Sequence, residues 1–345
     1  MQLEDLLSSP LWLPASVSLD SLVFEEISED TLRKSPFLDA RAVGRTGKKL
    51  PVPLKTLFEQ QEKIFASAGP IHEIFHISHV GSTFVARLLE NFPDSVVYKE
   101  PPILNGLTAQ FQEDQQGLAY FDRDTLLRIN AIIYGFMSAK GHKTIIKHTS
   151  QNLLLPRALQ GFGLDIRPAL YLYTDLQDFL CHGLASQGLQ LDSHNNIRNR
   201  VIFMNAVALN EKFIVSQLDP LQKMAVLWMA EMLKLILRSA PEQGDRLFDF
   251  DAEFAAKDRT AIVTDLATHF SFDLTPETVQ GIATNPVWES NSKTAKKHSF
   301  EDRQANIKAN AKTHKESLAA TLSWTRSICQ KNITLHKLLP FIEAE

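Results

Sequence analysis

From residue 71 onward, short runs of β-branched and aromatic residues alternate with longer segments that have the apolar spacing of helices. Runs of this length are typical of buried strands, because a helix needs more residues to present an apolar face. Their alternation with helices predicts an α/β protein with a mainly parallel sheet that is flanked by helices on both sides. The expected strands are Ile71–Ile77, Ser95–Tyr98, Thr144–Lys147, Ala169–Tyr173 and Arg246–Phe250.

One helix is marked especially clearly in the sequence. Asp219 is suited to cap its start, and Pro220 suits the first helical position. Apolar residues then recur on one face up to Leu235, which indicates that this helix packs against the core.

Polar residues follow each of the five expected strands. They are His79 with Gly81–Thr83, Lys99 with Glu100, Lys147 with His148, Thr174 with Asp175, and Asp251. In open parallel sheets, ligands bind outside the carboxyl ends of the strands. The pattern therefore predicts a ligand site at that edge of the sheet.

The turn after the first expected strand, "HVGST" at His79–Thr83, is typical of an anion site. Backbone N–H groups at a helix start are unpaired, and the helix dipole favours negative charge there. Gly81 lets the backbone approach a ligand, while Ser82 and Thr83 add hydroxyl donors. The pattern G-x-x-x-x-G-K-S/T of nucleoside-triphosphate loops is not met, since His76 and Ser82 replace its first Gly and its Lys. Taken alone, the Gly-Ser-Thr tripeptide is more typical of a capped helix start than of an anion site.

Composition and charge limit the partners of the chain. Its 345 residues are 44% apolar, which suits a sizeable core, and a net charge of −4 gives no general attraction to nucleic acid or anionic membranes. Cys181 and Cys329 lie far apart, which predicts free thiols in a reducing compartment. No stretch approaches the roughly 20 apolar residues of a membrane span, and the start is acidic where a signal peptide is basic. These features predict a cytoplasmic protein without nucleic-acid or membrane partners.

Residues 1–70 lack this alternation of apolar runs and helical segments. Pro36, Pro51 and Pro53 interrupt short apolar runs, and a helix-like segment ends at Gly69-Pro70. We therefore expect an amino-terminal cap over residues 1–70 and an α/β core over residues 71–345.

Several segments follow one another in an order that resembles the sulfotransferases that use 3′-phosphoadenosine 5′-phosphosulfate (PAPS), in particular the bacterial sulfotransferase-like proteins. "HVGST" resembles the Lys/Arg-Ser-Gly-Ser/Thr-Thr loop of that family, and "YKEPPIL" resembles its second-strand Lys/Arg-Glu-Pro. "TIIKHTSQNLL" resembles the third-strand lysine segment, and "ALYLYTDLQDFLCHGLAS" the segment that binds the 3′-phosphate. The resemblance covers about residues 71–330 and implies the P-loop-like sulfotransferase fold.

The resemblance also implies a reaction and a co-substrate. PAPS would donate a sulfuryl group to a hydroxyl or amine of a small molecule or saccharide. Gly81, Ser82 and Thr83 would hold the 5′-phosphosulfate end of PAPS, because they match the family loop residue by residue.

The same resemblance implies roles in catalysis. Glu100 would accept the proton of the acceptor, while His79 and Lys147 would face the charge that develops on the leaving phosphate. Lys99 would orient Glu100 or contact the sulfuryl group. The plainer alternatives are a surface pair of Lys99 with Glu100, a solvated Lys147, and a His79 that is only a polar loop residue.

The segment that resembles the 3′-phosphate site departs from the family pattern. Thr174 replaces its Arg, Leu176 its Pro and His182 its Ser, whereas Asp175 and Asp178 match. Replacing Arg by Thr removes a bidentate phosphate contact. Thr174, Asp178 and His182 are therefore donor-site candidates by position, with helix caps and a half-buried core histidine as the alternatives.

A basic run, "SKTAKKHSFEDR", resembles the carboxy-terminal loop of the family that closes over the donor. Lys297 and Arg303 are its candidates for the positive charge that the 3′-phosphate segment lacks. A solvated basic face is the alternative, and the absence of interleaved aromatic residues argues against nucleic-acid binding.

Two other functions are consistent with the sequence. A nucleotide-dependent phosphotransferase would need a metal-binding carboxylate, for which Asp175, Asp249 and Asp251 are the candidates. Otherwise no metal is expected, because no nearby Cys or carboxylate completes a metal site with His76 and His79. A non-catalytic binding protein that has lost its 3′-phosphate pocket is the third possibility, and the substitutions in that segment favour it.

Overall fold

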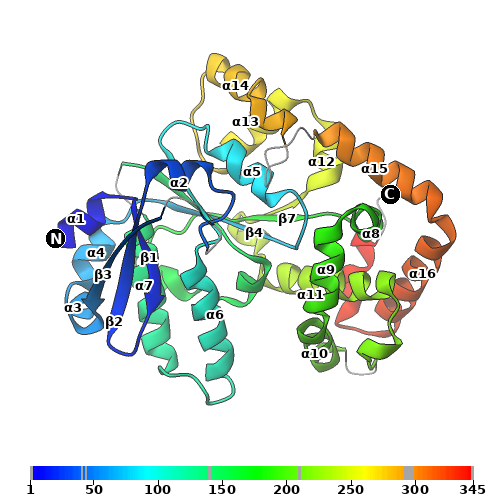
Figure 1. Cartoon of the computed structure of the whole chain (residues 1–345), viewed down its shortest axis with the longest axis horizontal. Helices are drawn as coiled ribbons and strands as arrows, with labels where there is room; N and C mark the ends of the chain where they lie inside the picture. The colour runs from blue at the N-terminus through cyan, green and yellow to red at the C-terminus, as the bar shows by residue number, and fades with distance from the viewer. Residues whose placement is uncertain are drawn as a thin grey trace. The chain divides into compact units, whose positions relative to one another are not determined.

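The computed structural model describes residues 3–39, 42, 45–138, 141–208, 211–290 and 299–342 (Figure 1). Lys297 lies outside these residues, so its role stays a prediction. The chain forms two compact units. Unit 1 comprises Met1–Phe75, Thr83–Leu170 and His269–Phe272, and unit 2 comprises His76–Ser82, Tyr171–Thr268 and Asp273–Glu345. The division into a cap and a core at residue 70 stays a prediction.

The predicted α/β architecture is confirmed. A parallel sheet has five strands in the order β5-β6-β4-β7-β8, and helices flank it. The strands are β4 (Ile71–His76), β5 (Ser95–Lys99), β6 (Lys143–Lys147), β7 (Leu170–Tyr173) and β8 (Arg246–Asp249). Each of them ends within about one residue of the expected bounds, because the apolar runs end where the buried strands end. The register of β5 and β6 places Lys99 opposite Lys147.

The larger helices follow the expected alternation. After β4 they are α5 (Ser82–Leu89), α6 (Pro102–Asp114), α7 (Arg123–Met137), α8 (Leu176–Ala185), α9 (Gln187–Asn195), α10 (Ile197–Val207), α11 (Pro220–Arg238), α12 (Phe250–Ala256), α13 (Arg259–His269), α14 (Pro276–Ala283), α15 (Phe300–Thr313) and α16 (Lys315–Lys331). The helix predicted after Asp219 is confirmed as α11. Its cap accepts the Gln222 N–H at 2.8 Å, and Pro220 occupies the first turn.

Short 3₁₀ segments connect some of these elements. They are Ser150–Leu154, Ala158–Phe162, Val215–Gln217, Pro241–Gln243, Pro286–Glu289 and Leu335–Phe341.

The amino-terminal part of unit 1 contains a second sheet that the sequence did not predict. β1 (Trp12–Val17), β2 (Ser21–Ile27) and β3 (Arg45–Pro53) pair antiparallel in the order β1-β2-β3. Pro14 lies at a register shift in one edge strand, and Pro51 and Pro53 lie in the other. Proline has no N–H group to donate to a neighbouring strand, but it is tolerated in edge strands. Because proline interrupts the apolar pattern, these edge strands could not be predicted from the sequence.

Helices accompany this sheet in the first part of unit 1: α1 (Leu3–Ser8), α2 (Glu29–Lys34), α3 (Leu54–Glu59) and α4 (Gln61–Ser67). Ser28 caps α2 by accepting the Thr31 N–H at 3.0 Å. Figure 1 shows β1 beside α6 and α7, whose apolar faces form the core of unit 1 with the sheet.

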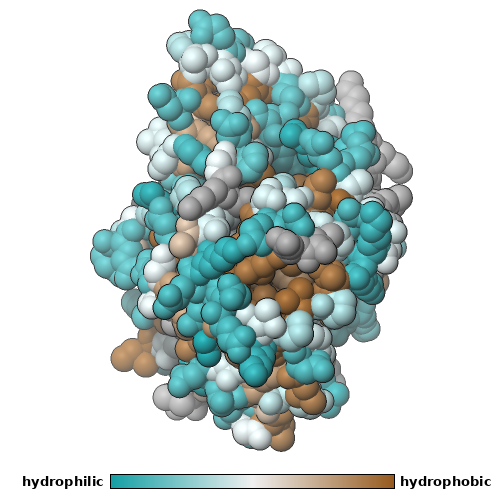
Figure 2. All heavy atoms as spheres, turned by 90° about the vertical axis from the view of Figure 1, so that its left-hand side faces the viewer, coloured by the Kyte–Doolittle hydropathy of each residue, from teal (hydrophilic) through white to brown (hydrophobic). Residues whose placement is uncertain are grey.

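Figure 2 shows one face of the molecule, on which hydrophilic side chains predominate and hydrophobic atoms are exposed in smaller areas. Large hydrophobic side chains that unit 1 exposes include Leu19, Leu118 and Tyr120. Among the helices described, none combines the length and the apolar character that a membrane crossing requires.

We expect Phe24→Ala to lower the free energy of unfolding by about 3–5 kcal/mol. Phe24 is fully buried in β2, and the centroids of its ring and the Phe136 ring of α7 are 4.7 Å apart. Urea denaturation followed by circular dichroism measures the change. Leu19→Ala is the control, because the Leu19 side chain is 69% exposed. Equal small effects of both substitutions would contradict the packing of the amino-terminal sheet on α7.

Candidate functional site

The turn between β4 and α5 has an unusual backbone. His79 and Gly81 adopt left-handed conformations, with φ angles of 64° and 76°. A Cβ atom on residue 81 would lie 2.3 Å from Cε2 of Phe250, so glycine is required at this position. Gly81 thus serves the fold of the turn itself, and the close neighbour that it admits is an aromatic ring of unit 2.

Two hydroxyl groups, those of Ser82 and Thr83, lie at the start of α5. Ser82 and Thr83 are 5% and 3% exposed. Neither side chain makes a hydrogen bond within the part of the chain that the structure describes. Hydroxyl groups beside the N–H groups of a helix start are suited to bind anionic oxygen atoms.

A buried carboxylate holds the beginning of the turn. Glu231, on α11, accepts the Ser78 N–H at 2.6 Å and the Ser78 hydroxyl at 3.2 Å. Arg200, on α10, donates to the same carboxylate at 2.6 Å. Neither Glu231 nor Arg200 was predicted. The available signal for Glu231 was a charge on the apolar face of a helix, three residues after Trp228.

Arg303, on α15, forms a buried bidentate ion pair with Asp251. Its Nε and Nη2 atoms lie 2.8 and 2.7 Å from the two carboxylate oxygens, and Asp251 is only 1% exposed. The Thr174 hydroxyl donates to the same carboxylate at 2.8 Å, and the Gln304 amide does so at 2.9 Å. Arg303 Nη1 also lies 3.5 Å from the His79 carbonyl oxygen. Within unit 2, two predicted residues, Thr174 and Arg303, therefore bind one carboxylate, and the backbone of a third, His79, lies near the guanidinium.

Further carboxylates follow β7 and β8 in unit 2. Burial, aided by repulsion from Asp178, raises the pKa of Asp175 to about 7. Burial also raises the pKa values of Asp178 and Asp249 to about 6 each, with repulsion from Asp251 as a further cause. Asp175 and Asp249 cap α8 and α12 by accepting the N–H groups of Asp178 at 2.7 Å and of Ala252 at 3.0 Å. The half-buried Asp178 carboxylate accepts no hydrogen bond from the residues described.

The histidines predicted for the site have separate surroundings. His79 is half-buried, and its Nε2 lies 3.9 Å from the Asp192 carboxylate on α9. His182 is half-buried on α8, and its role in donor binding stays a prediction. Within the described ranges, no group of three or more His, Cys, Asp or Glu side chains is placed to hold a metal ion.

In unit 1, Lys99 is completely buried at the end of β5. Its ammonium donates to the carbonyl oxygens of Leu32 and Arg33 at 2.8 and 3.0 Å, in the last turn of α2, and forms an ion pair with Glu90. Burial lowers the pKa of Lys99 and raises that of Glu90 to about 7. The ammonium has three hydrogen atoms, and these contacts use them all. Lys99 therefore fixes α2 to β5.

Lys147, buried at the end of β6, forms an ion pair with Glu100. Glu100 follows β5 with a left-handed φ of 56°, and its N–H donates to the Lys147 carbonyl oxygen at 2.7 Å. The Lys147 ammonium lies 5.4 Å from the centroid of the Phe37 ring. Two predicted catalytic residues are thus in direct contact, whereas Lys99, which was predicted to orient Glu100, has other partners.

Directly after β6, His148 belongs to a buried polar network that was not predicted. Glu73 Oε1 accepts the Tyr134 hydroxyl at 2.7 Å and lies 2.9 Å from His148 Nε2. Asn152 Nδ2 lies 3.4 Å from His148 Nδ1, and the Phe75 ring stacks on the imidazole at 4.2 Å. Hydrogen bonds in a low-dielectric interior are strong, so this network stiffens the end of β6. Its signal in the sequence was a charged residue, Glu73, within a strand that was expected to be buried.

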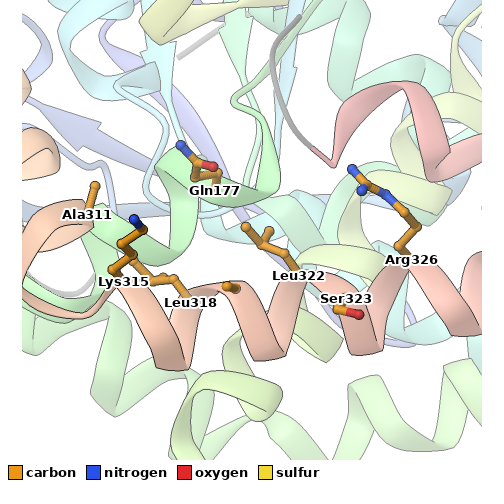
Figure 3. A pocket seen from close by; sticks show the side chains of 8 residues that line it. Gln177, Ala311, Lys315, Leu318, Leu322, Ser323 and Arg326 are labelled. Atoms are coloured by element: carbon orange, nitrogen blue, oxygen red, sulfur yellow. The ribbon is translucent and has the colours of Figure 1, made fainter.

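A hollow of about 450 Å³ lies between α8 and α16 of unit 2. Figure 3 shows Gln177 on α8 opposite Lys315, Leu322 and Arg326, which lie along α16. Its lining contains none of the residues that were predicted for the donor or for catalysis.

No protein-family model and no curated protein matches the chain. Three similar solved structures are sulfotransferases. The sulfotransferase domain of the Synechococcus olefin synthase is 10% identical over 72% of this chain and 94% of that chain, with a TM-score of 0.35. A Mycobacterium tuberculosis H37Rv sulfotransferase is 13% identical over 75% and 80% of the respective chains, with a TM-score of 0.39.

The third, a sulfotransferase from Alicyclobacillus acidocaldarius, is 14% identical over 70% of this chain and 95% of that chain, with a TM-score of 0.33. Similarity at these values carries no argument about the reaction. The structure defines an α/β protein with a five-stranded parallel sheet, an architecture that hosts many unrelated functions.

Lys99→Met is expected to lower the free energy of unfolding by about 3 kcal/mol at pH 8, because it leaves the Glu90 carboxylate buried without its counter-charge. The loss should be smaller at pH 5, where Glu90, with its pKa of about 7, is protonated. Urea denaturation at both pH values measures it. Adding Glu90→Gln should restore most of the loss at pH 8. A Lys99→Met variant as stable as the wild type at both pH values would refute the structural role of Lys99.

Asp175→Asn is expected to stabilise the protein at alkaline pH and to leave it unchanged near pH 4. The pKa of Asp175 is about 7 in the folded protein against 3.8 for the free side chain. The folded state therefore holds the proton more tightly, and this group makes stability fall as the pH rises from about 4 to 7. Asn and Asp are about equally good helix caps, so the free energy of unfolding of the variant should rise by about 1–2 kcal/mol at pH 8.

Urea denaturation at pH 4 and pH 8 measures this difference. Asp122→Asn is the control, because Asp122 also caps a helix, by accepting the Thr125 N–H at 2.7 Å, but hydrogen bonding to Thr125 lowers its pKa. That variant should gain nothing at pH 8. A gain at pH 4 equal to the gain at pH 8 for Asp175→Asn would rule out the buried charge as its cause.

Proposed function

We propose that the protein is a sulfotransferase that moves a sulfuryl group from a phosphosulfate donor to a hydroxyl or amine of a small molecule or saccharide. The observation that carries this proposal is the pair of hydroxyl groups on the largely buried residues Ser82 and Thr83, which have no hydrogen-bond partner among the described residues. With the N–H groups of α5 they are suited to anionic oxygen atoms. A phosphoryl donor is less well supported, since Ser82 replaces the lysine of nucleoside-triphosphate loops.

The proposed reaction needs a base and positive charge. The acceptor atom attacks sulfur, the bond from sulfur to the phosphate oxygen of the donor breaks, and the proton of the acceptor moves to a base. Glu100 is the proposed base, and its ion pair with Lys147 supports this role because it holds the carboxylate in one place. Lys147 would stabilise the leaving phosphate, and a protonated His79 was predicted from the sequence for the same role.

PAPS is the donor that was predicted from the sequence, and its two ends fit the residues differently. The hydroxyls of Ser82 and Thr83 suit the 5′-phosphosulfate end. Arg303 and Thr174 are candidates to bind the 3′-phosphate, but both already donate to the Asp251 carboxylate. The residues therefore support a phosphosulfate donor more strongly than they support its 3′-phosphate.

A non-catalytic binding protein is the second candidate, and the Phe250 ring supports it. The ring lies against Gly81, in the turn where a phosphosulfate would bind. A phosphotransferase is less well supported, because its candidate metal ligands have other tasks: Asp251 pairs with Arg303, and Asp249 caps α12. Cytoplasmic location and the lack of nucleic-acid and membrane partners stay predictions from composition.

Transfer of radiolabelled sulfur tests the proposed function. Donors with and without the 3′-phosphate are both supplied, with a mixture of phenols, alcohols, amines and saccharides as acceptors. We expect labelled acceptor with at least one donor. Glu100→Gln and Lys147→Met should each lower the rate about 10²–10³-fold, because one removes the base and the other removes the charge.

Lys63→Met is the matched control, since the Lys63 ion pair with Glu4 is largely solvent-exposed, and it should leave the rate unchanged. Circular dichroism verifies that each variant is folded. Phosphate transfer from Mg²⁺–ATP without sulfur transfer would replace the proposal by the phosphotransferase. Nucleotide binding without transfer of either group would replace it by the binding protein.

A further inference from the structure

Within unit 2, carboxylates lie in and near the segment that resembles a 3′-phosphate site. Asp175 and Asp178 follow β7, Asp249 ends β8, and Asp251 lies two residues further on. Asp178 is close enough to Asp251 and Arg303 for both to affect its pKa. Arg303 is thus a cation among several carboxylates.

Arg303 is not free to bind a phosphate. Both oxygens of Asp251 are held by its guanidinium, and a phosphate that drew Arg303 away would leave a carboxylate that is 1% exposed without its counter-charge. A phosphate at this position would also be repelled by Asp178 and Asp249, because like charges interact strongly where water is excluded. The residues present therefore do not fit a 3′-phosphate.

A free ribose hydroxyl fits the same residues. The half-buried Asp178 carboxylate accepts no hydrogen bond from the described part of the chain, so it can accept one from a hydroxyl. Dinucleotide-binding folds use the same distinction, since an Asp or Glu selects a free ribose hydroxyl and an Arg accommodates a phosphate.

The carboxylates and the turn are joined through one side chain. Arg303, while paired with Asp251, lies 3.5 Å from the carbonyl oxygen of His79. His79 belongs to the turn that would hold the phosphosulfate in the proposed function. One nucleotide can therefore meet the turn with its 5′ end and this group of carboxylates with its ribose.

We propose that the donor is a nucleoside 5′-phosphosulfate with a free 3′-hydroxyl, and that Asp178 and Asp249 select against a 3′-phosphate. The inference rests on the proposed function, because it concerns the donor of that reaction. Its chemistry is that of the proposed transfer, with a nucleoside 5′-monophosphate as the leaving product.

Calorimetric titration of the full chain with AMP and with adenosine 3′,5′-bisphosphate tests the inference, because these ligands differ only in the 3′-phosphate. We expect AMP to bind at least about ten times more tightly. Asp178→Asn and Asp249→Asn each remove one charge, and Asn keeps the cap that Asp249 provides. Each should tighten bisphosphate binding about three- to tenfold. Asp178→Asn should also weaken AMP binding, because a neutral amide oxygen accepts a weaker hydrogen bond from the ribose hydroxyl than a carboxylate does.

Asp258→Asn is the matched control. Asp258 is an exposed carboxylate that caps α13 by accepting the Ala261 N–H at 2.8 Å, and its substitution should change neither affinity. Tighter binding of the bisphosphate than of AMP, unaltered by Asp178→Asn, would overturn the inference and leave the proposed function standing. Failure of both nucleotides to bind a folded wild-type protein would overturn the proposed function and the inference together.

Discussion

The bidentate ion pair between Arg303 and Asp251 is the interaction on which the arrangement of unit 2 most depends. It joins α15 to the start of α12, just after β8, and the same carboxylate binds the hydroxyl of Thr174 at the end of β7. Arg303 also approaches the carbonyl oxygen of His79 in the turn after β4. Buried charges are tolerated only when they are paired and hydrogen-bonded. Loss of Arg303 or Asp251 would therefore remove the contacts that hold residues after β4, β7 and β8.

In unit 1 the buried cations that need carboxylate partners are lysines. Lys99 and Lys147 are fully buried and lie opposite one another at the ends of β5 and β6, and each has its own carboxylate, Glu90 or Glu100. Burial, more than repulsion from Lys147, lowers the pKa of Lys99. Because the carboxylates come from different elements, the two lysines have different tasks. Lys99 holds α2, while the pair of Lys147 and Glu100 stays together at the strand ends.

The strands of the parallel sheet could be predicted because each is a short apolar run with helical segments on either side. The antiparallel sheet could not, because prolines in its edge strands break the pattern. Residues at strand ends were found from the general position of ligands in parallel sheets, but their partners were not. Arg303 is 52 residues from Asp251, and Ser78 is 153 residues from Glu231. No local pattern specifies a pair over such distances, because packing of the whole unit brings the two side chains together.

The backbone of the turn and the guanidinium of α15 are both groups that bind anions, yet each meets a buried carboxylate of the chain, Glu231 or Asp251. A ligand must therefore rely on groups that the described residues leave without partners. The hydroxyls of Ser82 and Thr83 can donate to anionic oxygen, whereas the carboxylate of Asp178 can only repel an anion or accept from a hydroxyl. These groups together favour a ligand that is anionic at one end and hydroxylated at the other. Charge, more than the shape of the fold, thus limits which ligands these residues can bind.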